Sequence, residues 1–499
     1  MKKNTLGKNA ILNGIKTVCS ILFPFISFSY CSRVLGADAL GAYSFSQSII
    51  AYLLLVAALG IPNYAIREGA FVRKRKEKLN EFVAQIFTIN CIMTVITYGI
   101  LIILLISWPK LVSYKKIVVI QSVQIVLTTL GADWINSIFE DYLYLAVRYI
   151  VIQIISIVAL FLFVKSPADI YVYTFISMMS NAGGNILNWR YIKKNGVKLR
   201  LTTRINLNKH FIPIFILFFN CIASTIYLNS DITMLGMYNA DSIVGVYTVS
   251  SKIYSMLKTL LTSVIMVTLP RFSLYVAEKK KVEYKQTLTL VQDYLIIFTL
   301  PIAVGLFLEG DKILNIVAGS EYINGDMVVK ILAIAIPFAI EACFFTYSIL
   351  IPNRKEKNFL VSTVVAALLN IILNIILLPK YGIYAAAFTT LIAEFVVMCI
   401  TAYYSVKVVC FDFNIKIFLQ TLIGCLGIAC MCILLDKTCM SDNIKLIIEI
   451  FISALTYVVI LIISKCDLVV NLIYKIKNTR FGNNNYICYE VWHLNIQKK

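Results

Sequence analysis

Charged residues are scarce in this chain of 499 residues, and their scarcity excludes an ordinary water-soluble protein. Only 14% of the residues carry a charge, whereas about a quarter is usual in soluble domains. The hydrophobic share is 60%, mean hydropathy is +0.82, and the apolar residues form long blocks such as 82–106 and 359–378. A chain of this composition belongs in a lipid bilayer.

Metal ligands and nucleotide-binding loops are also missing. His210 and His493 are the only imidazoles, and the thirteen cysteines form no CxxC pair and are scattered mostly through apolar segments. Cysteine at such positions behaves as a small hydrophobe. The sequence has no GxxxxGK[ST] loop of the kind that binds ATP phosphates. We therefore expect no metal site, no cofactor and no ATP-driven step.

The apolar blocks predict membrane helices rather than barrel strands. A span must satisfy its own backbone polar groups, so only helices and closed barrels can cross the bilayer. Barrel strands alternate apolar and polar residues over about ten positions, whereas these blocks are continuously apolar and mostly longer. Reading about 20 residues per crossing, we predict an all-α integral membrane protein with about fourteen transmembrane helices, at 9–32, 42–65, 81–107, 117–137, 149–165, 170–189, 210–230, 242–269, 288–308, 328–351, 359–378, 383–405, 418–435 and 444–464.

The distribution of Lys and Arg predicts the orientation of these spans. With the N-terminus in the cytoplasm, the cytoplasmic segments carry 33 of the 46 basic residues, the external connections carry 8, and five lie within spans. Cytoplasmic loops are enriched in Lys and Arg, so both termini are expected inside, in a multi-pass protein of the cell (inner or plasma) membrane. Contact of basic runs such as 73–78 with anionic lipids explains the net charge of +20, and no nucleic-acid partner is expected.

A short sequence pattern recurs at an offset of 204 residues. GAYSFSQSI at 41–49 opens the second span, and GVYTVSSKI at 245–253 opens the eighth. The two spans are six helices apart, and an even separation preserves the orientation in the membrane. This pattern predicts two parallel repeats related by an axis along the membrane normal, a transporter layout in which the substrate site lies between the halves. Chance similarity among small residues at helix starts is the alternative.

The opening of the chain resembles a known family of transporters. Asn9, a first helix interrupted by Pro24, the segment RVLG at 33–36 and the segment GAYS at 41–44 are similar to the polysaccharide-repeat-unit (Wzx-like) flippases. These proteins belong to the multidrug/oligosaccharidyl-lipid/polysaccharide exporter superfamily, and the resemblance covers roughly residues 5–465. The repeat predicts an N-terminal six-helix lobe at 1–200 and a C-terminal six-helix lobe at 201–410, and the basic residues predict a cytoplasmic tail at 465–499. Twelve spans are common among such flippases, so the resemblance implies two additional helices at 411–464.

Charges inside the predicted spans mark a candidate substrate site. A charged side chain at mid-bilayer costs about 2.5–3.5 kcal/mol on insertion scales, so its default interpretation is functional. In the eighth span, hydroxyl residues and two lysines share one face, and the first span has a similar polar stripe. We expect these stripes to line the seam between the lobes and to bind a sugar diphosphate, through Lys16, Lys252, Lys258, Asn13, Ser251, Ser255 and Thr262.

The same residues have simpler alternatives. Lys16 and Lys252 lie near opposite membrane surfaces and could extend to water there, whereas Lys258 lies near the middle of its span. Among the carboxylates, Glu341 and Asp293 are candidates for coupling transport to H+ or Na+. Pro24, Pro301 and Pro337 lie inside spans and are candidate bending points, with a static kink as the alternative.

The resemblance implies a flippase for surface polysaccharide synthesis, such as that of O-antigen. It would move a polyprenyl-diphosphate-linked oligosaccharide from the cytoplasmic to the outer leaflet by alternating access, with membrane lipids as its other partners. A multidrug cation exporter of the same superfamily is one alternative, and it would need an acidic cavity. A membrane-embedded polysaccharide polymerase or glycosyltransferase is the other. It would need a large catalytic surface, and the largest external connection, 309–327, is short. We therefore expect a transporter and not an enzyme.

Overall fold

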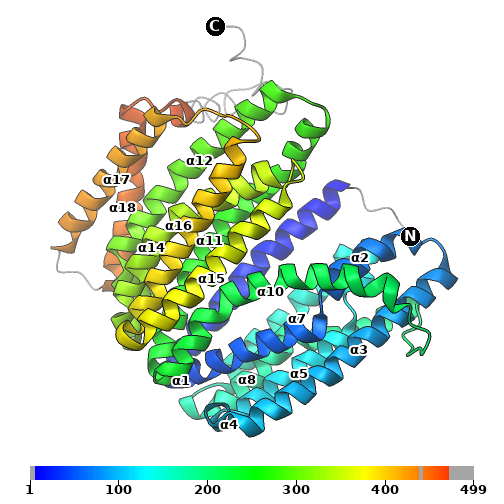
Figure 1. Cartoon of the computed structure of the whole chain (residues 1–499). Helices are drawn as coiled ribbons and strands as arrows, with labels where there is room; N and C mark the ends of the chain where they lie inside the picture. The colour runs from blue at the N-terminus through cyan, green and yellow to red at the C-terminus, as the bar shows by residue number, and fades with distance from the viewer. Residues whose placement is uncertain (1–5, 438–441, 471–499) are drawn as a thin grey trace. The chain divides into compact units, whose positions relative to one another are not determined.

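The computed structural model describes residues 6–437 and 442–470 and is helical throughout, with no strand in these residues (Figure 1). The predicted all-α class is confirmed. The predicted cytoplasmic tail is covered only as far as residue 470, so its remaining part lies outside the described residues.

The helices follow one another with short connections. The α-helices are α1 (Leu6–Ala58), α2 (Ile61–Val72), α3 (Lys76–Ser107), α4 (Pro109–Ser113), α5 (Lys115–Gly131), α6 (Trp134–Ile138), α7 (Tyr142–Phe163), α8 (Ile170–Met178), α9 (Gly184–Lys194), α10 (Leu207–Tyr238), α11 (Asp241–Ala277), α12 (Lys281–Leu308), α13 (Gly310–Ala318), α14 (Asp326–Phe344), α15 (Glu356–Tyr381), α16 (Ile383–Val406), α17 (Ile415–Asp436) and α18 (Asp442–Ile463). Short 3₁₀ segments, η1 (Pro167–Asp169) and η3 (Ser320–Gly325), and π segments, η2 (Met179–Gly183) and η4 (Phe345–Leu350), interrupt them.

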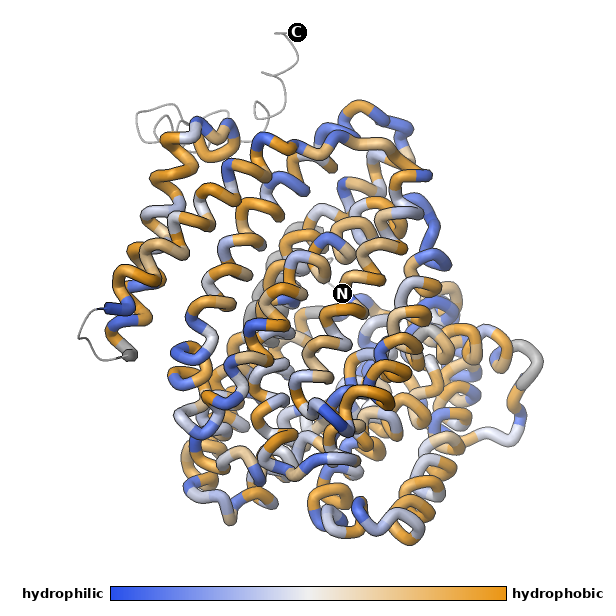
Figure 2. The backbone as a smooth tube through the Cα atoms, turned by 60° about the vertical axis from the view of Figure 1, so that its left-hand side comes forward, coloured by the Kyte–Doolittle hydropathy of each residue, from blue (hydrophilic) through white to orange (hydrophobic). Residues whose placement is uncertain are grey.

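The described chain has twelve helical segments that are long and apolar enough to cross a membrane. Apolar residues cover most of the length of the long helices in Figure 2, and side chains such as Ile106 and Val267 are exposed, as a helix facing lipid requires. The chain is therefore a multi-pass membrane protein. The number of crossings, about fourteen, stays a prediction.

Two regions explain the difference between twelve and fourteen. The predicted spans 9–32 and 42–65 both fall largely on α1, which is bent at Gly36 (φ 77°, ψ 173°) rather than divided by a loop. Glycine adopts this positive φ without steric cost. The predicted span 170–189 falls on α8, η2 and α9, where the π segment breaks the helix into pieces that are individually short.

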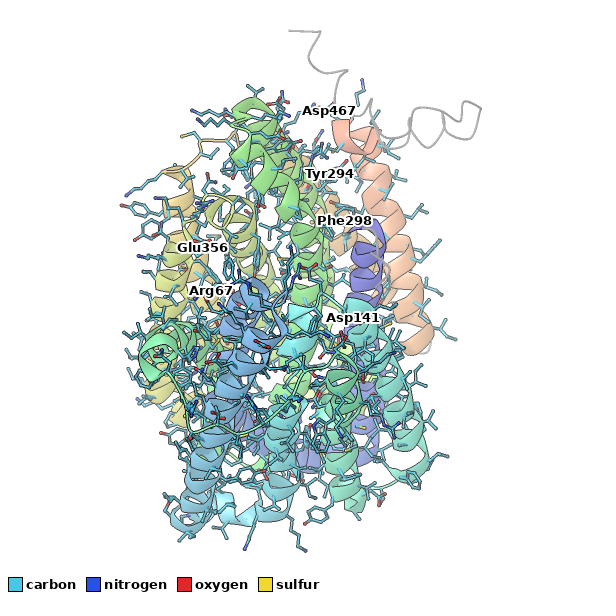
Figure 3. All side chains as sticks on the ribbon, turned by 90° about the vertical axis from the view of Figure 1, so that its right-hand side faces the viewer. Arg67, Asp141, Tyr294, Phe298, Glu356 and Asp467 are labelled. Carbon is cyan, nitrogen blue, oxygen red and sulfur yellow. The ribbon has the colours of Figure 1, made fainter. Side chains whose placement is uncertain are left out.

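Polar residues at helix starts fix several boundaries. Asp141, labelled in Figure 3, precedes α7, and its carboxylate accepts a hydrogen bond of 3.2 Å from the backbone N–H of Tyr144. Asn414 does the same for Ile417 at the start of α17, at 3.3 Å. A side-chain acceptor at this position satisfies one of the free N–H groups of the first turn, so these helices begin where the sequence supplies a cap.

The chain divides into two compact units. The first comprises Met1–Tyr284 and Gly310–Cys410, and the second comprises Lys285–Glu309 and Phe411–Lys499. The second unit therefore holds most of α12 with α17 and α18, and its apolar core includes Ile297, Ile428 and Tyr457. The Tyr457 hydroxyl donates a hydrogen bond of 2.7 Å to the Ile297 carbonyl. The expected lobes at 1–200 and 201–410 stay a prediction.

Candidate functional site

The two copies of the repeated pattern meet at a close crossing of α1 and α11. A Cβ atom added to Gly41 would lie 1.8 Å from the backbone oxygen of Asp241, and one added to Gly245 would lie 2.1 Å from the backbone oxygen of Ala37. The two contacts are equivalent. Gly41 faces Asp241 and Gly245 faces Ala37, and each pair, Ala37 with Asp241 and Gly41 with Gly245, is separated by the repeat offset of 204 residues. The repeated glycines therefore allow the two helices to approach backbone to backbone.

Hydrogen bonds on either side of this crossing join segments that precede residue 200 to segments that follow it within the first unit. The Tyr114 hydroxyl donates to Asp241 Oδ1 at 2.7 Å. The Tyr322 hydroxyl donates to the Ser32 carbonyl at 3.0 Å, and the backbone N–H of Ala37 donates to Glu321 Oε1 at 2.9 Å. All of these residues lie in or beside the connections that sequence analysis places outside the membrane. Together with the glycine crossing they close this end of the interface.

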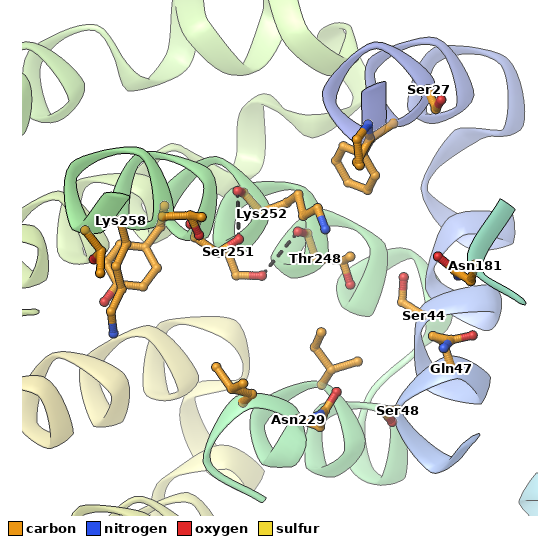
Figure 4. Close-up of a pocket in the computed structure, with 18 of the residues that line it drawn as sticks. Ser27, Ser44, Gln47, Ser48, Asn181, Asn229, Thr248, Ser251, Lys252 and Lys258 are labelled. Atoms are coloured by element: carbon orange, nitrogen blue, oxygen red, sulfur yellow. Dashed lines mark hydrogen bonds between the residues drawn. The ribbon is translucent and has the colours of Figure 1, made fainter. Parts of the chain in front are cut away.

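A cavity of about 1420 Å³ occupies the first unit. Along α11 the lining runs from Tyr247 and Thr248, next to the glycine crossing, to Pro270. At about 1.5 Å per residue this stretch is roughly 33 Å long, comparable to the hydrocarbon core of a bilayer. Side chains from α1, α7, α8, α10, α11, α14, α16 and the two π segments line it (Figure 4).

Five of the predicted substrate residues line this cavity. Its wall contains Lys252, Lys258, Ser251, Ser255 and Thr262, of which Figure 4 labels Lys252, Lys258 and Ser251. The opposite face of α11 turns away from the cavity, where Val249 is buried and Leu260 and Val264 are exposed. Asn13 and Lys16 lie on α1, but their side chains are outside the described residues. The binding role of all seven stays a prediction.

Lys258 forms an ion pair with Glu394 of α16. Glu394 is only 3% exposed, and it also accepts a hydrogen bond of 2.8 Å from the Tyr254 hydroxyl. The Lys258 ammonium lies 5.9 Å from the centroid of the Tyr254 ring and 6.0 Å from that of Tyr227, within range of a cation–π interaction. The charge of Lys258 is therefore compensated within the cavity wall.

Lys252 is different, because no carboxylate pairs with it among the described residues. Its ammonium lies 6.0 Å from the centroid of the Phe28 ring on α1, and its backbone carbonyl accepts a hydrogen bond of 2.9 Å from Ser255. The described cavity wall holds two lysines, Lys252 and Lys258, and two carboxylates, Asp231 and Glu394. The cavity is therefore balanced in formal charge, and Lys252 is its uncompensated cation.

Sequence analysis missed a buried polar network around Asp231 of α10. Asp231 accepts hydrogen bonds from Tyr247 at 2.8 Å, Asn374 at 2.6 Å and Thr390 at 2.6 Å. Asn374 also donates to Asn370 at 3.1 Å. Asp231 escaped attention because the predicted seventh span ended at residue 230. Asn370 and Asn374, four residues apart on one face of α15, were the signal that could have indicated a polar site.

The predicted coupling carboxylates do not line the cavity. Glu341 lies on α14 within the first unit, and Asp293 lies on α12 within the second. Asp293 is buried and accepts a hydrogen bond of 3.5 Å from Asn414 of the same unit. Asp231 and Glu394 are the carboxylates in the described cavity wall.

Comparison with known proteins identifies the family. The profile of the polysaccharide biosynthesis protein family matches residues 6–276, more than half of the chain. The chain belongs to this family. A Shigella dysenteriae protein provisionally named as an O-antigen transporter is 22% identical over 396 residues, covering 78% of this chain and 98% of its own. The Staphylococcus aureus capsular polysaccharide biosynthesis protein CapF is 24% identical over 417 residues, covering 79% of this chain and 97% of its own.

Solved structures show the same fold. The lipid II flippase MurJ, in an inward closed conformation, superposes with a TM-score of 0.74 at 20% identity, covering 92% of this chain and 100% of MurJ. An inward-facing multidrug transporter of the MATE family in the MOP superfamily gives a TM-score of 0.58 at 13% identity, covering 80% of this chain and 97% of that one. The family match confirms the resemblance that the opening of the chain indicates, and the solved structures confirm the fold.

Proposed function

We propose that this member of the polysaccharide biosynthesis family is a flippase that moves a polyprenyl-diphosphate-linked oligosaccharide from the cytoplasmic to the outer leaflet. The observation that carries the proposal is the large cavity within the membrane helices, whose lining includes hydroxyl, amide and charged side chains and in which Lys252 has no carboxylate partner among the described residues. At about 1420 Å³ it exceeds the roughly 300–1,000 Å³ usual for small-molecule sites, which suits an oligosaccharide. Both curated relatives are named for surface polysaccharides.

The side chains of the cavity suggest how the headgroup is held. The Lys252 ammonium supplies a charge-assisted donor for a phosphate oxygen. Ser251, Ser255 and Thr262 supply hydroxyls on the same face of α11, and Lys16 and Asn13 of α1 remain candidates to join them. Lys258 can bind a phosphate only if the phosphate displaces Glu394 from it. Lys258 therefore serves as a secondary ligand. The lipid tail stays in the bilayer throughout.

The closed end of the interface supports alternating access. The Lys and Arg distribution assigns this end, with the Gly41–Gly245 crossing, to the outer side of a cell membrane, with both termini in the cytoplasm. The cavity then faces inward in this state. The repeated pattern supports two lobes, 1–200 and 201–410, that rock about the α1–α11 contact, with residues 411–464 as added helices.

The membrane potential supplies part of the driving force. A diphosphate carries about two negative charges, and each is worth roughly 2.3 kcal/mol per 100 mV, so outward movement in an inside-negative cell is favourable by several kcal/mol. A coupling ion, H+ or Na+, would add to this. Glu394 is placed to exchange a proton when a phosphate displaces it from Lys258, and Glu341 and Asp293 remain alternative coupling groups.

A multidrug cation exporter is the second candidate, because the cavity wall contains two carboxylates and the fold is that of a MATE transporter. However, both carboxylates are already occupied, Glu394 by Lys258 and Asp231 by three hydrogen bonds. An organic cation would therefore have to displace these partners, and the Lys252 ammonium would repel it.

A polymerase or glycosyltransferase is less well supported, since the candidate binding residues line a cavity among helices long enough to cross a membrane.

The test is translocation in proteoliposomes that contain purified protein and a fluorescent polyprenyl diphosphate carrying chitobiose. We expect wild type to expose the glycan on the opposite leaflet, and Lys252→Ala to reduce the rate at least tenfold, since a charged hydrogen bond is worth about 1.5–3 kcal/mol. Lys252→Arg should retain part of the rate, because the charge survives while its geometry changes.

Lys380→Ala is the matched control, because Lys380 is exposed near the end of α15 and does not line the cavity. It should transport as wild type does. Equal rates for Lys252→Ala and Lys380→Ala would contradict the proposed site, and no translocation by wild type would contradict the function.

A further inference from the structure

The two sides of the cavity differ in charge. Every charged side chain of the described lining, Asp231, Lys252, Lys258 and Glu394, comes from α10, α11 or α16. The lining contributed by α1, α7, α8 and η2 carries no charged residue among the described positions. We name six polar residues of this uncharged side the N-terminal wall: Tyr43, Gln47, Gln153, Ser177, Ser180 and Asn181.

The N-terminal wall is rich in amides and hydroxyls and contains aromatic rings. The Tyr43 hydroxyl lies 2.6 Å from Ser177 Oγ, and Ser180 donates to Gln153 Oε1 at 3.0 Å. The bond from Ser180 occupies the carbonyl oxygen of the Gln153 side-chain amide and leaves the N–H groups of that amide available. The Tyr43 ring also packs on Tyr173, with centroids 4.7 Å apart. This combination offers donors, acceptors and a ring face in fixed positions.

A break in the helix presents two of these residues to the cavity. Ser180 and Asn181 lie on the π segment Met179–Gly183, between α8 and α9. π segments in helices are rare and frequently occur at functional sites. Asn181 is exposed and makes no hydrogen bond to the described residues. In Figure 4, Asn181 lies close to Ser44 and Gln47 on one side of the cavity, whereas Lys258 lies on the other.

We propose that the N-terminal wall is a subsite for uncharged sugar residues, next to the diphosphate position at Lys252, so that the headgroup binds in one orientation. Amide and hydroxyl groups match the hydroxyls and acetamido groups of neutral sugars. Among the described lining residues contributed by α1, α7, α8 and η2, an acidic sugar would find no lysine or arginine, and an amino sugar no carboxylate. Burying an unpaired charge is costly, so the subsite selects neutral repeat units. The inference rests on the proposed flippase function and specifies its substrate class.

The test measures binding to the full-length protein in nanodiscs with three fluorescent probes: bare polyprenyl diphosphate, the same lipid carrying chitobiose, and the same lipid carrying a diuronate. We expect wild type to bind the chitobiose probe at least tenfold more tightly than the bare probe, and the diuronate probe with no such gain. A net hydrogen bond is worth about 0.5–1.5 kcal/mol, so Asn181→Ala should weaken binding of the chitobiose probe about 2- to 12-fold and leave binding of the bare probe unchanged.

Gln153→Leu should act in the same direction as Asn181→Ala, whereas Lys252→Ala should weaken binding of all three probes. Asn358→Ala is the matched control, because Asn358 does not line the cavity. The subsite is refuted if wild type binds the bare and chitobiose probes equally, or if it binds the diuronate probe as tightly as the chitobiose probe. It is also refuted if Asn181→Ala weakens binding of the bare probe as much as binding of the chitobiose probe. If Lys252→Ala still weakens binding of the probes in these cases, the flippase proposal stands without the subsite. If wild type binds none of the probes, both proposals fail.

Discussion

Lys258 and Glu394 illustrate how a buried charge is kept in a membrane helix. An isolated lysine at mid-bilayer costs about 2.5–3.5 kcal/mol on insertion scales. Here the ion pair, the hydrogen bond from Tyr254 and the ring of Tyr227 surround the two charges. Such a pair contributes little by itself, but removing one partner leaves the other charge buried and unpaired, at a cost of about 3–5 kcal/mol.

This asymmetry yields a stability prediction. Lys258→Ala should lower the thermal midpoint of the purified protein, because Glu394 is left without its cation, and Glu394→Gln should lower it for the converse reason. The double variant Lys258→Met/Glu394→Gln removes both charges with similar volumes and should recover most of the loss. Thermal unfolding in detergent measures all three. A double variant as unstable as the sum of the single variants would show that the pair is not coupled.

Sequence analysis could place residues on a helix face but could not find their partners. The polar face of α11 followed from the helical period alone, and its lysines do line the cavity. The depth of Lys258 in its span favours it over Lys252 as a phosphate ligand. In the structure Glu394, 136 residues later, pairs with Lys258, and the proposal therefore gives Lys252 the main role. Pairing between residues so far apart in the sequence depends on tertiary packing, which helical periodicity does not predict.

At the scale of elements, the contact between α1 and α11 depends on two glycines. The added Cβ atoms would meet backbone oxygens rather than flexible side chains, so the helices would have to separate. Gly41→Ala and Gly245→Ala should therefore weaken the closed end of the interface. Their effect should exceed the helix-propensity gain of up to about 1 kcal/mol that alanine brings over glycine.

The measurement is crosslinking by a short bifunctional maleimide between cysteines introduced at Tyr114 and Asp241, whose side chains meet across this end, in a background whose native cysteines are replaced. Crosslinking should become slower in both glycine variants. Gly99→Ala is the control, because a Cβ atom added to Gly99 of α3 would meet nothing within 4 Å. Its crosslinking rate should match that of the protein in which all three glycines are retained. Unchanged crosslinking in Gly41→Ala and Gly245→Ala would mean that the crossing does not hold this end closed.

Helices were predictable from hydropathy where they are long and regular, such as α3 and α15. The predictions were less accurate where the backbone departs from a regular helix. The bend at Gly36 joins two predicted spans in one element, and the π segment at Met179–Gly183 divides another. Both departures depend on local backbone geometry, which apolar composition does not predict. Both lie in elements that line the cavity or form the closed end of the interface.

At the scale of the whole molecule, orientation is the first property to test. The Lys and Arg distribution predicts that both termini lie in the cytoplasm, with about fourteen crossings. Reporter fusions should be active outside after Lys116, Lys165 and Lys437, and inside after Lys78, Arg200 and Lys281. An external C-terminus would require an odd number of crossings and would overturn the predicted spans.

The central claim is that the protein moves a lipid-linked glycan between leaflets. The most direct measurement is the leaflet distribution of that glycan in spheroplasts of the native host, labelled with a membrane-impermeant lectin before and after depletion of the protein. We expect depletion to leave the lipid-linked glycan inaccessible while its total amount rises, and expression of wild type, but not Lys252→Ala, to restore labelling. Undiminished external labelling after depletion would contradict the account.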